Sequence, residues 1–340
     1  MPKPRVVFFG SDAIALPSLE FLYGEGSPSC ELVGILTQPD RPSGRGRKLR
    51  PNPVKAWASE HGIPVREPEK LGEGEASWLQ EEGADLSLVI AYGHILSRQL
   101  LDAPDRGTFN LHGSLLPAYR GASPAETALA EGETETGVTL MRVVPRMDAG
   151  PMVDRETVPI EQGVDGPSLR EKLAEACVPL LRRNLATLLA GEATEEPQDE
   201  DQATYCRKLR KEDGALDFRA SATVLARRVA AFRGWPGSFF DLRGTSVKVG
   251  AAEAGEGNID AKPGAVILPD CGGLALCTGA GVLNLLELQR PGGRMMPAND
   301  FLRGFPLEAG ELIPSQNLTE LLDPESSKCL NSKKLTCANS

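Results

Sequence analysis

Two polar side chains that can act on a carbonyl group lie two residues apart in the segment Phe109–Gly121, FNLHGSLLPAYRG. On a β-strand, Asn110 and His112 point to the same face, because side chains alternate along a strand. An asparagine amide can donate a hydrogen bond to an oxygen that gains negative charge, and a histidine can do the same or move a proton. The pair is therefore a candidate site for oxyanion or acid–base chemistry.

A third polar residue, Asp148, follows a strand-like run in the motif RMDAGP. Its carboxylate can orient an imidazole or accept a proton directly. None of the three residues is a strong nucleophile, and Ser114 lacks the G-x-S-x-G turn of a hydrolase serine. The set predicts direct transfer of an acyl group to an amine or to water. On spacing alone two other interpretations stay open, since Asn-x-His pairs often satisfy local backbone groups and aspartates before glycine often form turns.

The first half of the chain must supply the elements that position these residues, and it alternates apolar runs with helical patterns. This alternation predicts a mostly parallel sheet with helices on both faces. Ligands of such sheets bind at the carboxyl ends of the strands. Predicted strands cover 5–10, 31–38, 85–93 and 107–113, and predicted helices cover 16–25, 53–62 and 123–132.

The second half changes character after a long amphipathic helix predicted over 167–191. Short runs broken by glycines follow a helix at 221–232 and are typical of a small barrel. The pattern predicts an α/β fold in which a Rossmann-like, mostly parallel sheet domain precedes a small OB-like β-barrel domain, with Trp235 in the barrel core. The expected domains are residues 1–191 and 207–312, joined by a linker over 192–206 and followed by a disordered tail over 313–340.

Composition limits the class of protein. With 41% hydrophobic and 25% charged residues among 340, the chain is of the globular type. No apolar run approaches the roughly 20 residues that span a bilayer, and the first residues lack the pattern of a signal peptide, so we expect a cytoplasmic protein without a membrane partner. The seven cysteines form no C-x-x-C pair and there are three histidines, which predicts neither a disulfide framework nor a metal site.

Two basic regions interrupt a net charge of −10. Residues 41–55 hold six basic residues and no acidic one, and residues 204–250 hold ten basic against four acidic residues. An acidic protein with two basic regions is a candidate for binding one polyanion at a defined place.

The segment NLHGSLLPAYRGASP, with MDAGP downstream, resembles the signature of the folate-dependent formyltransferases. The resemblance covers roughly residues 5–310. It implies that Asn110, His112 and Asp148 are the catalytic residues and that 10-formyltetrahydrofolate is the formyl donor, without a metal. The segment AYGHIL is similar to the family's folate pocket. The implied folate-binding residues are Val89, Ile90, Ala91, Tyr92, Gly93, His94, Ser114, Leu115, Leu116 and Pro117.

The basic segment TQPDRPSGRGRKLRPNPVKAWA resembles the loop by which some members of this family contact the acceptor arm of initiator tRNA. The segment AAFRGWPGSFFDLRGTSVKV is similar to the C-terminal domain of the same members. The resemblance implies methionyl initiator tRNA as the formyl acceptor and partner, with Arg45 as the first candidate for contact, and we expect a monomer. The implied tRNA-binding residues are Arg41, Arg45, Arg47, Lys48, Arg50, Lys208, Lys211 and Arg228.

Other functions stay open. The same three residues fit formyl transfer to an amino sugar nucleotide or a purine precursor, hydrolysis of the donor, or a non-catalytic folate-binding relative. An NAD-type oxidoreductase is disfavoured, because no G-x-G-x-x-G motif follows the first strand.

Overall fold

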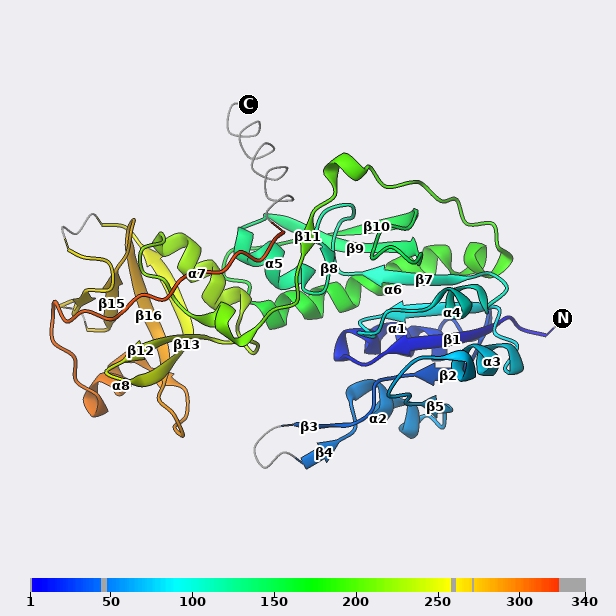
Figure 1. The fold of residues 1–340 in the computed structure, drawn as a ribbon, viewed down its shortest axis with the longest axis horizontal. Coiled ribbons are helices and arrows are strands. Elements are labelled where there is room, and N and C mark those ends of the chain that lie inside the picture. The colour runs from blue at the N-terminus through cyan, green and yellow to red at the C-terminus, as the bar shows by residue number, and fades with distance from the viewer. Residues whose placement is uncertain (1, 44–47, 258–260, 271, 324–340) are drawn as a thin grey trace.

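The N-terminal lobe is built on a seven-stranded sheet (Figure 1). The computed structural model describes residues 2–43, 48–257, 261–270 and 272–323. The strands follow the order β10-β9-β7-β6-β1-β2-β5, in which β9 is antiparallel to both of its neighbours and all other neighbouring pairs are parallel. The predicted mostly parallel sheet is thus confirmed. The strands are β1 (Arg5–Gly10), β2 (Glu31–Leu36), β5 (Val65–Arg66), β6 (Leu86–Ile90), β7 (Thr108–His112), β9 (Glu135–Arg142) and β10 (Met152–Pro159).

Helices cover both faces of this sheet, which is why its inner strand β1 can be apolar from Val6 to Phe9. Val6 and Phe8 pack toward one face, and Val7 and Phe9 pack toward the other. The first face is covered by α1 (Leu16–Tyr23), α2 (Pro53–Glu60), α5 (Pro124–Glu131) and α6 (Gly166–Ala190). The second face is covered by α3 (Glu73–Glu81) and α4 (Arg98–Asp102).

The long helix α6 begins and ends where its sequence predicts. The Asp165 side chain accepts a hydrogen bond from the Ser168 backbone N–H, and Pro167 occupies the first turn, where a missing N–H costs nothing. Gly191 ends the helix in a left-handed conformation with φ of 73°. These caps fix the helix along the sheet face opposite to Asn110 and His112.

The C-terminal lobe carries a curled antiparallel sheet with its own core, as predicted for a small β domain. Its six strands are β12 (Ser238–Leu242), β13 (Thr245–Gly255), β14 (Val266–Ile267), β15 (Leu274–Cys277), β16 (Val282–Gln289) and β17 (Met296–Pro297). Helix α7 (Ala222–Ala231) packs on this sheet and also against α5 of the first lobe, and α8 (Ala298–Gly304) packs on β16.

Residues 192–206, predicted to be a linker, lie along the N-terminal lobe. Their last part forms β11 (Tyr205–Cys206), which pairs in parallel with β8 (Arg120–Gly121) just beyond β7. Gln198 in the middle of this segment is buried. The segment therefore belongs to the structure around β7, beside its role as a connection between the lobes.

Residues 313–323, which we call the strap, run from the second lobe back to the first (Figure 1). Ile313 is buried in the core of the second lobe, and Leu321 is buried in the core of the first. Leu322 forms a bridge with Cys206, which adds a third segment beside β11 and β8. The predicted disordered tail is wrong for the strap, and residues 324–340 lie outside the described residues.

Two basic segments of β-structure flank residues 44–47, which are not described. Strands β3 (Arg41–Ser43) and β4 (Lys48–Arg50) form an antiparallel pair between β2 and α2. In the described part of the chain, no helix is long and apolar enough to cross a membrane.

Candidate active site

Asn110 and His112 lie at the carboxyl end of β7, where the sheet ends of β1 and β6 also meet. The backbone register pairs Val89 with Asn110 and Gly10 with Ile90, so these strand ends form one edge. The Asn110 side chain is half-buried, and no described group forms a hydrogen bond with its amide. Its N–H donors are thus free to bind a ligand at this edge.

His112 is 6% exposed, and both of its ring nitrogens face an acceptor. Nε2 lies 3.0 Å from the backbone oxygen of Tyr119. A carbonyl oxygen can only accept, so Nε2 carries the hydrogen of this bond. Nδ1 lies 3.7 Å from Oδ2 of Asp148, which is close enough for charge attraction and too far for a direct hydrogen bond.

Asp148 reaches His112 from the loop between β9 and β10. Its backbone has φ of 49°, a left-handed conformation that non-glycine residues rarely adopt. Its Oδ2 accepts a hydrogen bond of 2.8 Å from the Gly121 N–H. Gly150 lets the loop close, because a Cβ there would lie 1.8 Å from the Arg142 carbonyl oxygen. The structure therefore brings together the three polar residues that the sequence pattern singled out.

The turn after β7 places the Tyr119 carbonyl beside His112. The Ser114 hydroxyl donates to the Ala118 carbonyl at 2.6 Å, and the Tyr119 N–H donates to the Thr204 hydroxyl at 2.8 Å. Ser114 and Leu116 are fully buried, whereas Leu115 and Pro117 are half-buried. Of these four predicted folate-binding residues, Ser114 and Leu116 therefore serve as the interior framework of the turn.

The predicted folate segment Val89–His94 leaves β6 at the same edge of the sheet. Ile90 and Tyr92, also predicted to bind folate, are both 2% exposed, and their side chains pack in the core and not at the surface of the edge. Burial raises the pKa of the Tyr92 hydroxyl. Ala91 and Gly93 have φ of 47° and 80°, and their exposed backbone lies beside the half-buried Val89 and His94.

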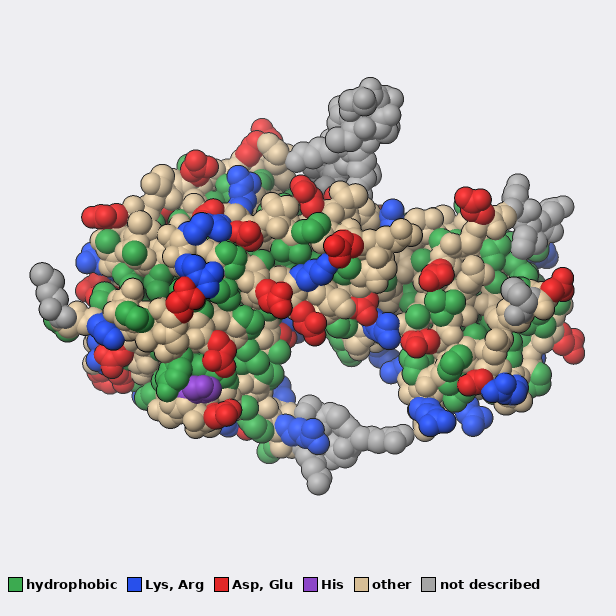
Figure 2. Space-filling model, turned by 180° about the vertical axis from the view of Figure 1, so that it is seen from behind, with side chains coloured by type: hydrophobic (Ala, Val, Ile, Leu, Met, Phe, Trp, Pro, Cys, Tyr) green, Lys and Arg blue, Asp and Glu red, His purple; other side chains and the backbone are tan. Residues whose placement is uncertain are grey.

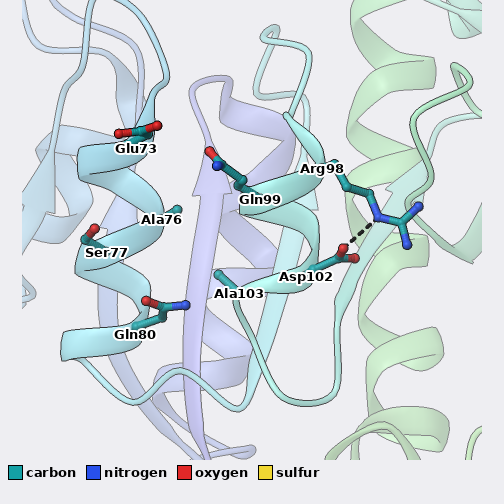
Figure 3. Close-up of a pocket in the computed structure, with 8 residues that line it drawn as sticks. All are labelled: Glu73, Ala76, Ser77, Gln80, Arg98, Gln99, Asp102 and Ala103. Atoms are coloured by element: carbon teal, nitrogen blue, oxygen red, sulfur yellow. Dashed lines mark hydrogen bonds and ion pairs between the residues drawn. The ribbon is translucent and has the colours of Figure 1, made fainter.

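A recess of about 470 Å³ lies between α3 and α4 and is shown in Figure 3. Its lining includes Glu73, Gln80 and Gln99, together with Arg98, whose Nε donates to Asp102 at 2.6 Å. None of the predicted catalytic or folate-binding residues lines it. The candidate active site is therefore defined by side-chain chemistry at the edge of the sheet, away from this recess.

The predicted tRNA-binding residues differ in their exposure to solvent. Arg41, Arg50, Lys208 and Lys211 are exposed. Lys48 lies in β4, while Arg45 and Arg47 lie outside the described residues. Figure 2 shows an open hollow between the two lobes, with Lys and Arg side chains on the rim that the C-terminal lobe forms.

Arg228 does not belong with the exposed basic residues. It is 7% exposed in α7, and its guanidinium donates to the Thr319 carbonyl of the strap at 2.6 Å. Burial lowers the pKa of this guanidinium. Trp235, predicted to be in the core, is 59% exposed. The structure therefore places Arg228 in the interior and Trp235 at the surface, the reverse of what the sequence predicted for these two side chains.

Two residues that sequence reasoning missed lie behind the Asp148 loop. The Gln198 amide donates to the backbone carbonyls of Asp148 and Gly150, and the fully buried Arg120 donates to the Gln198 side-chain oxygen. Arg120 follows Tyr119 in the motif AYRG, so the sequence shows where it lies in the chain. The sequence does not show that its side chain is buried and binds Gln198.

Comparison with protein families gives two matches that follow the two lobes. The profile described as formyl transferase matches residues 5–185, and the profile described as formyl transferase, C-terminal domain, matches residues 208–306. Methionyl-tRNA formyltransferase from Methylococcus capsulatus is 43% identical over 309 residues, which cover 91% of this chain and 99% of that protein. The protein of the same name from Halorhodospira halophila is 42% identical over 309 residues, with the same coverage of 91% and 99%.

Solved structures share the fold at lower sequence identity. The sugar 3N-formyl transferase WlaRD, crystallised with dTDP and 5-N-formyl-THF, has a TM-score of 0.62 at 15% identity and covers 86% of this chain and 100% of that one. HypX from Aquifex aeolicus, in complex with tetrahydrofolic acid, has a TM-score of 0.58 at 18% identity and covers 92% of this chain and 51% of that one.

Proposed function

Because this chain belongs to the formyl transferase family, we propose that it transfers a formyl group from 10-formyltetrahydrofolate to the α-amine of methionyl initiator tRNA. The observation that carries the proposal is the meeting of Asn110, His112 and Asp148 at one strand end. It occurs in a chain whose relatives, at 42–43% identity across both lobes, bear the name methionyl-tRNA formyltransferase.

Asn110 and His112 would stabilise the oxygen of the formyl group during the reaction. The amine attacks the formyl carbon, a new C–N bond forms, and the carbonyl oxygen gains negative charge. The free Asn110 amide can donate to that oxygen. His112 Nδ1 lies 3.7 Å from the Asp148 carboxylate, too far for a hydrogen bond. Nδ1 is therefore available to the same oxygen. Preorganised donors of this kind each lower a barrier by about 3 kcal/mol.

Asp148 would take the proton that the amine loses. Its side chain is 19% exposed, so one oxygen can meet the substrate while Oδ2 is held by the Gly121 N–H. The bond from the formyl carbon to the donor nitrogen then breaks, and that nitrogen receives the proton. An α-amine has an ordinary pKa of about 8 and is partly neutral at pH 7, so a carboxylate is a sufficient base.

The segment Val89–His94 would hold the folate donor. Its turn presents the exposed backbone of Ala91 and Gly93, which suits the hydrogen-bonding edge of a pterin. The His94 Nε2 is buried and has no partner among the described residues, which leaves one polar atom for a ligand. Leu115 and Pro117 complete the half-buried surface nearby.

Exposed basic residues on both lobes would hold the tRNA. Arg41 and Arg50 face each other at the base of the β3–β4 pair, and Lys208 and Lys211 follow β11 at the start of the second lobe. Lysine and arginine contacts to phosphates supply affinity by releasing counterions. The open hollow between the lobes in Figure 2 would admit the acceptor arm.

The test is an assay of the purified chain with 10-formyltetrahydrofolate and methionine-charged initiator tRNA. We expect formyl-methionyl-tRNA as the product, with elongator methionyl-tRNA as the matched control substrate. Formylation of an amino sugar nucleotide without any formylation of methionyl-tRNA would overturn the substrate assignment. Release of formate from the donor, with no acceptor needed, would show a hydrolase instead.

A further inference from the structure

We propose that Gln198 is a positioning residue that holds the Asp148 carboxylate beside His112. The inference rests on the proposed function, since it concerns the geometry of the residues that would perform formyl transfer. Gln198 lies 50 residues after Asp148 in a segment with no recognisable motif. It touches neither His112 nor the Asp148 carboxylate in the structure, and acts on the backbone instead.

The Gln198 amide closes the Asp148 loop from behind. Its Nε2 donates to the Asp148 carbonyl at 2.8 Å and to the Gly150 carbonyl at 2.7 Å. Both hydrogens of one amide nitrogen are thus used on two carbonyls of the same turn. These bonds fix the peptide groups that follow Asp148 and Gly150, and with them the direction in which Asp148 points.

The same loop is held by neighbours of Gln198 on both sides. Glu195 forms an ion pair with Arg142 at 2.6 Å where β9 ends, and Glu196 exchanges two backbone hydrogen bonds of 2.8 Å with Met152 where β10 begins. Glu200 pairs with Arg146 at 2.8 Å. Residues 195–200 therefore run along the whole loop, and Gln198 is the member that contacts the turn carrying Asp148.

Arg120 fixes Gln198 in the orientation that this role needs. Its Nε and Nη2 donate to the Gln198 Oε1 at 3.0 and 2.8 Å. An amide whose oxygen is bound by a guanidinium must direct its NH₂ group the other way, toward the two carbonyls. Arg120 is fully buried and also pairs with Glu200, so this arrangement is rigid.

The backbone of Asp148 explains why such support is required. A non-glycine residue with φ of 49° is strained and persists only where its surroundings over-determine it. Without Gln198, the Gly121 N–H would be the remaining described donor to residue 148, and it binds the side chain rather than the peptide. Relaxation of the turn would carry the carboxylate away from His112, and a displacement of about 1 Å can cost 100-fold in rate.

The test uses Gln198→Glu, which keeps the shape and the acceptor for Arg120 but replaces the NH₂ donor by a second oxygen. We expect kcat for methionyl-tRNA to fall about 10- to 100-fold, while KM for both substrates changes less than about threefold. A glutamate here pairs with the buried Arg120, which should limit the fall in melting temperature caused by the two lost hydrogen bonds. The matched control is Gln202→Glu in the same segment, where the side chain is exposed and kcat should stay unchanged.

A double-mutant cycle separates positioning from general damage. If Gln198 acts through Asp148, then Gln198→Glu should have little further effect on kcat in an Asp148→Asn background. Equal losses in both backgrounds, or an unchanged kcat in a folded Gln198→Glu variant, would overturn the proposal. Gln198→Met, of similar volume and with no hydrogen-bonding amide, repeats the test should the glutamate variant fold poorly.

An NMR measurement keeps this proposal distinct from the proposed function. The chain has three histidines, so the ring signals of His61, His94 and His112 can be assigned from single variants. Gln198→Glu should move the His112 signal and leave the other two in place. An unmoved His112 signal would overturn the positioning role. A wild-type chain that fails to formylate methionyl-tRNA would overturn the proposed function alone.

Discussion

At the scale of the residue, the two neighbours of the His112 ring determine what this histidine can do. The Tyr119 carbonyl holds Nε2, and the Asp148 carboxylate attracts Nδ1 without a hydrogen bond. The ring is thus fixed on one side by the Tyr119 carbonyl and lies beside the carboxylate on the other. Asn110, by contrast, has its amide free, so it is the donor available without any rearrangement.

Replacement of either donor should affect the rate more than substrate binding. Asn110→Ala and His112→Gln should each lower kcat about 100- to 1,000-fold, because each removes one preorganised donor to the oxyanion. Steady-state kinetics with methionyl-tRNA measures the change. His61→Gln is the matched control, since His61 stacks on Trp57 in α2 and lies outside the site. A loss confined to KM would contradict the oxyanion role.

Single residues also show where the sequence was informative. Asn110 and His112 were predictable because alternation along a strand is local. Gln198 was not, because its partners lie 48 and 50 residues earlier and its segment carries no periodicity. Arg228 could have been recognised, since it lies on the α7 face of the buried Leu225 and Val229, whereas its neighbour Arg227 is exposed.

At the scale of the element, the loop between β9 and β10 and the strap are the two segments that the sequence described least well. The strands and helices predicted from apolar periodicity agree with the structure to within a few residues at each end, whereas the short elements α4, β8 and β11 were not predicted. The loop and the strap owe their conformation to contacts with distant segments, and such contacts leave no local pattern. Within the strap, the apolar signals in an otherwise polar stretch were Ile313, Leu318, Leu321 and Leu322.

Gly150→Ala should disrupt the loop that carries Asp148. The new Cβ would lie 1.8 Å from the Arg142 carbonyl oxygen, so the backbone must move by more than an ångström. We expect kcat to fall at least about 100-fold and the protein to lose stability in thermal unfolding. Gly74→Ala is the matched control, because that position is helical and has open space around it. Full activity in Gly150→Ala would show that the loop tolerates a different path.

The Asp213 carboxylate couples the strap to the second lobe and should make stability depend on pH. Burial by itself would raise its pKa, but hydrogen bonds from Arg207, Thr319 and the Arg210 N–H outweigh this and lower the pKa to about 2. Because the pKa of Asp213 is lower in the folded chain than in the unfolded chain, its ionised carboxylate stabilises the fold at pH values above the unfolded pKa of about 4. This stabilisation is lost as the pH falls toward 2.

Chemical unfolding between pH 2 and pH 7 tests this coupling. The wild type should lose roughly 1–2 kcal/mol from this one group on acidification. Asp213→Asn should already be destabilised at pH 7 and should show a correspondingly flatter profile. The conservative Glu212→Gln, at an exposed neighbour, is the control. Parallel profiles for wild type and Asp213→Asn would contradict the assignment.

At the scale of the whole molecule, charge is distributed so that an acidic protein can still bind a polyanion. The exposed Lys208 and Lys211 lie near the junction of the lobes, whereas Arg228 is turned inward to hold the strap. The sequence could place the basic residues on two regions of the chain, but only the fold decides which of them reach solvent.

Substitution of these basic residues should separate binding from stability. The double variant Lys208→Ala, Lys211→Ala should raise KM for tRNA and reduce the slope of binding against salt by about 2, with unchanged thermal stability. Arg228→Ala should lower the free energy of unfolding by about 1–3 kcal/mol and leave the salt slope as it is. Salt titrations of tRNA binding and denaturant unfolding measure the two effects. A reduced slope in Arg228→Ala would return this residue to the tRNA surface.

The path of the strap has a consequence for chain synthesis. Leu322 packs beside Tyr119 and Cys206, and it is the Tyr119 carbonyl that holds the His112 ring. A ribosome must therefore have made the chain through Leu322 before the support behind His112 is complete. Products that terminate earlier lack this last layer, even if their two lobes have already folded, so the environment of the His112 ring depends on whether translation ran to that point.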